Sequence, residues 1–147
     1  MLETPLGAVS PIICFDSIYP ELTRDSVRCG GELITLSTND SWFGNSAAGG
    51  EHNRHAVLRA VESGRYLIRA ASTGISSIIS PTGSVDQSLG QSEYGFIMSD
   101  VYMIDENTVY TTIGDISVIA SAAAFAVIVL LFSLDRKRLS DRGGDAQ

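Results

Sequence analysis

The chain of 147 residues is 44% apolar and carries a formal net charge of -7. This length is enough for one modest domain with an appendage, and the acidic balance argues against nucleic-acid binding, which depends on a basic surface. Four of the ten basic residues lie near the C-terminus, namely Arg136, Lys137, Arg138 and Arg142. The rest of the chain is therefore more acidic than the net charge suggests.

The first third of the chain alternates between strand and helix patterns, which is typical of α/β proteins. Apolar residues predict a strand over 9–15. A helix is predicted from Pro20, which suits a first helical turn, to the Gly30-Gly31 pair, which ends it. A short apolar strand follows at 33–37, and then a polar, glycine-rich loop at 38–50.

The next segment predicts a helix over 51–64. Its apolar face consists of Ala56, Val57, Ala60 and Val61. His52, Arg59 and Glu62 are predicted to lie off this face. Strands at 66–71 and 75–79 follow, closed by a turn at 81–83.

The order of these elements fits a sheet whose loops gather at one edge. Arg65 and Arg69 flank the strand at 66–71, and we expect them to be solvated or paired with Glu62, although a contact to a lipid phosphate is an alternative.

The segment from Ile116 to Leu134 contains no charged residue and is long enough, as a helix, to cross a bilayer. Its polar residues are serines, which can bond to their own helix backbone: Ser117, Ser121 and Ser133. We predict a transmembrane helix over 116–134. The basic tail at 135–147 is then expected in the cytoplasm and residues 1–115 on the outer side.

The first seven residues lack the basic start and apolar core of a secretory signal. For a domain that faces outward, this leads us to expect that further sequence precedes Met1.

Cys14 lies where the strand at 9–15 ends and the helix begins. A thiol at the end of a rigid strand, beside a helix N-terminus, is placed to ionise and attack a carbonyl. The alternative is a buried cysteine that acts as a small hydrophobic residue. Cys29 could pair with Cys14, but we expect two free thiols, with Cys29 structural.

Several motifs, in order over residues 7–83, resemble the nitrilase-type (carbon-nitrogen hydrolase) domain of apolipoprotein N-acyltransferases. They are Ile13–Asp16, Tyr19–Leu22, Asn39–Gly44, Arg59–Arg65 and Ala71–Ile75. The approach to the apolar segment, Thr108–Tyr110 with Gly114-Asp115, is also similar.

The resemblance implies an α/β fold, as a partial αββα sandwich in residues 1–115, followed by the single transmembrane helix. It also implies a place in the bacterial inner membrane, with the domain on the periplasmic side. A lone half of this sandwich would expose strand edges and apolar faces.

The same resemblance implies that Cys14 is a nucleophile that carries an acyl chain as a thioester. In the family a glutamate acts as general base and a lysine supports the oxyanion, both upstream of the cysteine. The only lysine here is Lys137, beyond the predicted membrane helix, and the only upstream acid is Glu3, which reads as a solvated charge. Asp16 either supports the active-site network or caps the following helix.

The implied substrate-contacting residues are Asn39, Trp42, Phe43 and His52. Trp42 and Phe43 are alternatively membrane-interface anchors or ordinary loop packing, and a packing or hydrogen-bonding role is the default for His52. His52 and His55 have a spacing that could share a metal, but nothing completes a ligand set, so we expect no metal and no cofactor.

The first hypothesis is therefore the C-terminal part of an N-acyltransferase that moves an acyl chain from a phospholipid to the N-terminal cysteine of a lipoprotein. The second is a catalytically silent, membrane-anchored remnant that folds on a separate N-terminal half or another protein. The third is an amidase-type hydrolase, which the membrane helix disfavours.

Overall fold

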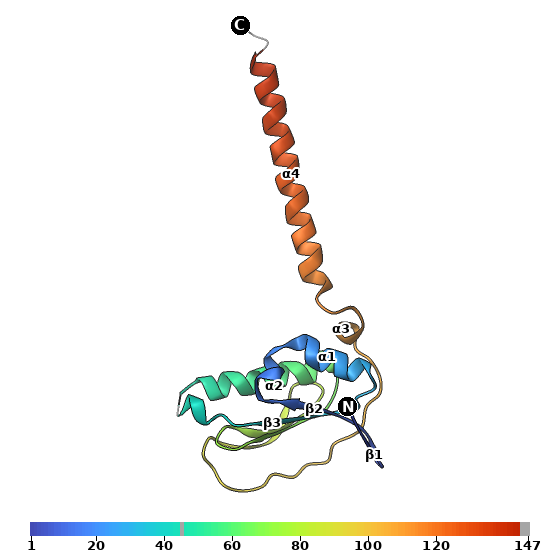
Figure 1. Ribbon diagram of the computed structural model, residues 1–147, viewed down its shortest axis with the longest axis vertical. Helices are drawn as coiled ribbons and strands as arrows, with labels where there is room; N and C mark the ends of the chain where they lie inside the picture. Colours follow the sequence, from blue (N-terminus) through green and yellow to red (C-terminus); the bar gives the residue numbers. More distant parts are fainter. Residues whose placement is uncertain (45, 145–147) are drawn as a thin grey trace. The chain divides into compact units, whose positions relative to one another are not determined.

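The computed structural model divides the chain into two units, Met1–Gly114 and a second unit that begins at Asp115. The structure describes residues 1–44 and 46–144, with side chains described as far as residue 133. The first unit holds a sheet with helices, and the second contains one long helix (Figure 1).

Within the described residues, six strands form one sheet in sequence order, β1 to β6. The strands are β1 Leu2–Thr4, β2 Gly7–Ile13, β3 Leu33–Thr38, β4 Leu67–Ala71, β5 Ser76–Ile79 and β6 Val85–Leu89. The central strands β2, β3 and β4 run parallel, whereas β1, β5 and β6 add antiparallel pairings at the two sides. The mixed α/β sheet confirms the predicted fold class.

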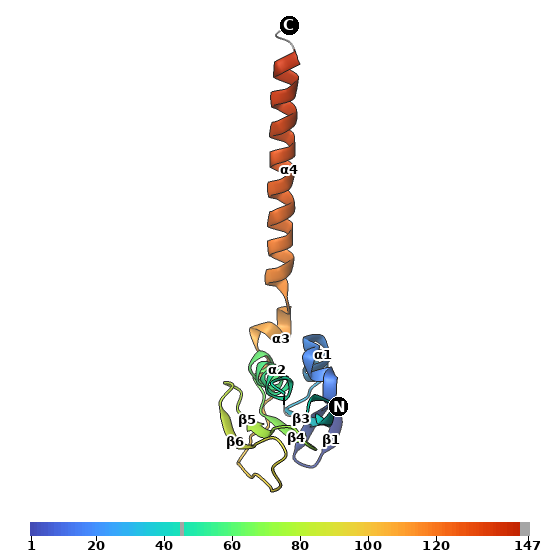
Figure 2. The ribbon, with the colours of Figure 1, turned by 90° about the vertical axis from the view of Figure 1, so that its left-hand side faces the viewer.

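Helices connect the parallel strands, as parallel pairing requires a crossover. Helix α1 (Pro20–Arg28) joins β2 to β3, and α2 (Ala48–Ser63) joins β3 to β4. Both helices cover the same face of the sheet (Figure 2). Pro20 opens α1 as predicted, and Gly64 caps the C-terminus of α2, where its left-handed φ of 64° lets its N–H bond back to the helix.

The hydrophobic core lies between this face and the two helices. Its buried members are Ile12, Val27, Ile34, Leu36, Ala56, Ala60, Leu67 and Ile79. Alternate residues of β2, β3 and β4 enter the core, as the two-residue period of a strand requires. The core therefore fixes which side chains of these strands face the helices.

The predicted face of α2 was wrong in part. His52 and Arg59 are buried at 3% and 4% exposure, whereas Val61 is 45% exposed. Both polar side chains have hydrogen-bond partners inside the unit, which offsets part of the cost of burying them, although Arg59 Nε is left without a partner. Apolar periodicity alone does not detect a helix face of this kind.

The segment at 90–107 runs along the opposite side of the sheet, as both ribbon views show. Arg65, at 1% exposure, helps to hold it, since this side chain donates to the carbonyls of Gly31, Ser63 and Glu106. The expectation that Arg65 is solvated or paired with Glu62 was therefore wrong. Burial lowers the pKa of Arg65, and the nearby acids Asp105, Glu32 and Glu106 oppose that shift.

Helix α3 (Val109–Ile113) packs against α1, where Arg24 donates to the carbonyl of Thr111 at 3.0 Å. The second unit is helix α4 (Ile116–Gly144), whose part from Ile116 to Ser133 has the length and composition to cross a membrane. Ser121 and Ser133 bond to the backbone one turn earlier, as predicted. The side chains of the basic tail lie outside the described residues.

Candidate active site

The carboxyl ends of the three parallel strands bring the predicted site segments together. Cys14 follows β2, the 39–43 loop with its short helix η2 (Ser41–Phe43) follows β3, and residues 72–74 follow β4. Loops at the carboxyl ends of parallel strands are the usual place for a site in such sheets. The predicted gathering of loops at one edge is confirmed.

Cys14 occupies a sharp turn between β2 and the 3-10 helix η1 (Cys14–Ile18). Its φ is 50°, in the left-handed region that non-glycine residues seldom adopt. Such a conformation costs on the order of 1–3 kcal/mol and persists only where the surroundings hold it. The side chain is half-buried and its thiol is free.

Two side chains converge on the carbonyl oxygen of Cys14. The hydroxyl of Ser17 donates to it at 2.9 Å, and His52 Nε2 lies 3.2 Å from it. Ser17 Oγ and His52 Nε2 are themselves 3.1 Å apart. These contacts hold the turn that carries the thiol, and both side chains are buried.

A buried carboxylate, Asp40, stands behind His52. Its Oδ1 lies 2.9 Å from His52 Nδ1, and its Oδ2 accepts from Arg69 at 2.6 Å. Thr38 donates to Oδ1 at 2.9 Å. Arg69 is only 1% exposed, so the expectation that it is solvated or paired with Glu62 was wrong.

The surroundings of Asp40 act on its pKa in opposite directions. Burial by itself raises the pKa of Asp40, but hydrogen bonds from its three partners, together with the charge of Arg69, outweigh burial and hold the pKa below its ordinary value of 3.8. Because the folded-state pKa is lowered, the ionised carboxyl stabilises the fold fully above its ordinary pKa. This contribution is lost as the pH falls through the folded-state pKa.

Aromatic rings cover the outer side of the imidazole. Phe15 stacks on His52 with centroids 5.4 Å apart and an interplanar angle of 20°. Phe43 meets both rings edge-on at 6.0 Å. Phe43 therefore contacts His52 beside the Cys14 turn, which joins three of the predicted site residues.

The other predicted site residues are more peripheral. Asp16 is exposed, and the N-cap of α1 is Tyr19 without a side-chain cap bond, so the helix-capping alternative is wrong. Asn39 is exposed and accepts a hydrogen bond from the backbone of Ser41. Trp42 is 86% exposed. Cys29, expected to be structural, is an exposed free thiol at the end of α1.

Sequence reasoning did not select Ser17, Asp40 or Arg69 as part of this network. Only Arg69 left a readable signal, because Leu67 and Arg69 share the core-facing side of β4. A charged residue at a core position of a strand requires a buried partner. The identity of that partner depends on a tertiary contact that local patterns do not contain.

Gly74 packs directly against Asp40. A Cβ at position 74 would lie 2.1 Å from Asp40 Oδ2 and 2.8 Å from Asp40 Cβ. Because hydrogen bonds hold this carboxylate in place, we expect Gly74→Ala to destabilise the fold by about 1–3 kcal/mol. The control is Gly50→Ala in α2, where a Cβ meets open space and alanine favours the helix.

Thermal unfolding followed by circular dichroism measures both variants. A Gly74→Ala protein as stable as Gly50→Ala would show that the Asp40 network tolerates displacement.

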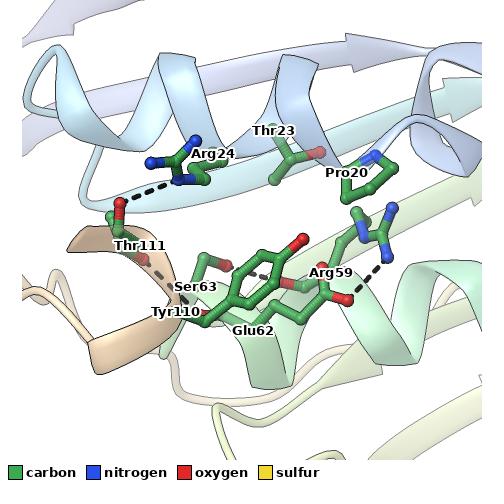
Figure 3. A pocket seen from close by; sticks show the side chains of 8 residues that line it. All are labelled: Pro20, Thr23, Arg24, Arg59, Glu62, Ser63, Tyr110 and Thr111. Atoms are coloured by element: carbon green, nitrogen blue, oxygen red, sulfur yellow. Dashed lines mark hydrogen bonds and ion pairs between the residues drawn. The ribbon is translucent and has the colours of Figure 1, made fainter. Parts of the chain in front are cut away.

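A small pocket lies between α1, α2 and α3 (Figure 3). Its lining residues are Pro20, Thr23, Arg24, Arg59, Glu62, Ser63, Tyr110 and Thr111. Many of these side chains bond to neighbours: Arg59 pairs with Glu62 at 2.9 Å, and Arg24 bonds to Thr111. None of the predicted site residues lines this pocket, and we assign its contacts to the packing of α3.

Comparison with known proteins places this geometry in a family. The family model for carbon-nitrogen hydrolases matches residues 1–110. The chain belongs to the carbon-nitrogen hydrolase family. The described sheet and the Cys14 turn both lie within the matched residues, so they are features of a carbon-nitrogen hydrolase domain.

Curated relatives of this carbon-nitrogen hydrolase chain are named apolipoprotein N-acyltransferase. The one from Gloeobacter violaceus is 40% identical over 83% of this chain and 23% of its own length. The one from Geobacter metallireducens is 37% identical over 88% of this chain and 25% of its own length. The chain thus spans about a quarter of the length of these relatives.

Among solved structures, a nitrilase-superfamily protein of Saccharomyces cerevisiae has the same fold. Its TM-score is 0.55, with 24% identity over 63% of this chain and 37% of that chain. At this identity the likeness concerns the fold alone.

Proposed function

We propose that this chain is the nucleophile-bearing part of an apolipoprotein N-acyltransferase. The observation that carries the proposal is Cys14 in a left-handed turn at the carboxyl end of β2, within a segment 40% identical to a protein of that name. A turn of this kind presents a side chain at the rim of the sheet, where a substrate can reach it. The apolar helix beginning at Ile116 supports a reaction on a lipid.

In the proposed reaction the Cys14 thiol, after losing its proton to a general base, attacks an ester carbonyl of a phospholipid. The ester bond breaks, the lysophospholipid leaves with a proton, and the acyl chain remains on Cys14 as a thioester. The amine of an N-terminal cysteine on a lipoprotein then attacks the thioester. An amide forms, the C–S bond breaks, and the thiol regains its proton.

We further propose that the general base and the oxyanion lysine lie outside residues 1–147. The one lysine of the chain, Lys137, follows the apolar helix, and the long curated relatives leave room for such groups. The positive charges at Arg136, Lys137 and Arg138 support a cytoplasmic tail and an outward-facing catalytic unit. Asp16, Asn39, Trp42, Phe43 and His52 remain predicted contributors to the site.

The test is acyl transfer from a labelled phosphatidylethanolamine to a synthetic diacylglyceryl-cysteine peptide, using membranes with the protein expressed from its complete gene. We expect Cys14→Ala to reduce the rate by at least about a thousandfold, to background, because the variant loses the thiol that is proposed to carry the acyl chain. The matched control is Cys29→Ala, which removes the more exposed thiol. Undiminished transfer by Cys14→Ala would contradict the proposal.

A further inference from the structure

We propose that His52 is a positioning residue, which keeps the Cys14 backbone in its left-handed conformation by donating a hydrogen bond from Nε2 to the Cys14 carbonyl oxygen. The consequence for catalysis rests on the proposed function of Cys14. The structural claim stands on the contacts around the turn.

The donors and acceptors around His52 Nε2 indicate that this nitrogen carries a proton. Its neighbours are the Cys14 carbonyl oxygen at 3.2 Å and Ser17 Oγ at 3.1 Å. The carbonyl only accepts, and the Ser17 hydroxyl already gives its proton to the same carbonyl at 2.9 Å. A hydrogen bond to this carbonyl therefore needs an N–H on Nε2, just as the contact with the Asp40 carboxylate needs an N–H on Nδ1, and the Cys14 carbonyl then receives two hydrogen bonds.

The far side of the imidazole is fixed by buried charged groups. Nδ1 lies 2.9 Å from Asp40 Oδ1 and 3.2 Å from Arg69 Nη2. Both charged side chains are buried, at 3% and 1% exposure, and bond to each other. The ring therefore cannot rotate away from Cys14 without leaving the carboxylate.

Aromatic stacking and the packing of helix α2 also restrict the His52 imidazole. Phe15 stacks on it at 5.4 Å and Phe43 contacts its edge. His52 belongs to the 16-residue helix α2, which packs on the sheet through Ala56 and Ala60. A rigid donor on a rigid helix can hold a strained turn, whereas a flexible surface side chain would not.

The first measurement is steady-state acyl transfer by the full protein. We expect His52→Phe, which keeps an aromatic ring but removes the donor, to lower kcat per folded molecule by at least about tenfold with little change in KM. His52→Gln keeps an N–H donor and is expected to retain most of kcat. The matched control is His55→Phe, a half-exposed histidine on the same helix.

The second measurement does not depend on activity. At a position with a left-handed φ, a protein with glycine is more stable than one with alanine, whereas at a position with an ordinary φ the protein with alanine is more stable. With His52 present, we therefore expect Cys14→Gly to melt about 3 °C above Cys14→Ala. In the His52→Phe background the turn can relax, and we expect the order of the two melting temperatures to be reversed.

The two measurements separate the two ideas. If the wild-type protein transfers no acyl chain, the proposed function fails. The melting temperatures of Cys14→Gly and Cys14→Ala still test the role of His52 in that case. If His52→Phe does not fold, Ser17→Ala removes the other donor to the Cys14 carbonyl, and we expect it to shrink the same glycine advantage. The proposal would be overturned if Cys14→Gly melted above Cys14→Ala by the same margin in every folded background and kcat were unchanged.

Discussion

Arg69→Met is expected to destabilise the first unit by about 3–5 kcal/mol, because it leaves the buried carboxylate of Asp40 without its cationic partner. Both side chains are almost fully excluded from solvent, and their oxygen and nitrogen are 2.6 Å apart. Methionine fills much of the same volume, so the loss is chiefly that of the charge. For a domain whose total stability is about 5–15 kcal/mol, this is a large fraction.

Two further variants separate charge pairing from general damage. Arg54→Met removes an arginine whose side chain is 74% exposed and pairs with Glu51 on the surface, so we expect a change within about 1 kcal/mol. Adding Asp40→Asn to Arg69→Met removes the buried carboxylate that has lost its arginine, and we expect it to restore part of the stability.

Thermal unfolding of the four proteins in mild detergent, followed by circular dichroism, measures these differences. Equal stability of Arg69→Met and Arg54→Met would mean that the buried pair does not hold this part of the fold.

Where the fold followed local rules, the sequence was sufficient to predict it. Helix α1 begins at Pro20 and ends at Arg28, just before the glycine pair, because proline and glycine impose these ends through their own backbone geometry. The parallel strands were visible as short apolar runs. The apolar helix from Ile116 was visible because it lacks charge altogether.

Elements that depend on pairing rather than burial escaped prediction. β6 is Val85–Leu89, and its side chains are almost all exposed. It forms because its backbone bonds to β5, not because its side chains alternate between core and solvent. β1 is likewise exposed and pairs with β2 across a tight turn at Pro5 and Leu6.

The sequence predicted the position of the Cys14 thiol in the candidate site but not the buried polar network that supports it. Cys14 was identified from its place between a strand and a helix and from a resemblance to a family motif. The polar network beneath it was missed because the helical period places His52 and Arg59 off the apolar face of their helix, and because the strand pattern around Arg69 does not identify its buried partner. Each is buried by bonding to a group distant in sequence, and tertiary packing overrides the local pattern.

The second large effect concerns the thiol itself, since Cys14 is expected to carry the acyl chain between donor and acceptor. Without a lipoprotein acceptor, the thioester has nowhere to pass its acyl group and should accumulate. Cys29 provides an internal comparison, because it is the more exposed of the two free thiols. Greater acylation of Cys14 cannot then result from exposure alone.

The most direct test is mass spectrometry of the wild-type protein, expressed from its complete gene and incubated with phospholipid in the absence of acceptor. We expect an acyl adduct on the peptide containing Cys14, released by neutral hydroxylamine and by the acceptor peptide, with Cys29 unmodified. Transfer to the acceptor without any adduct on Cys14, or equal acylation of Cys29, would contradict this expectation.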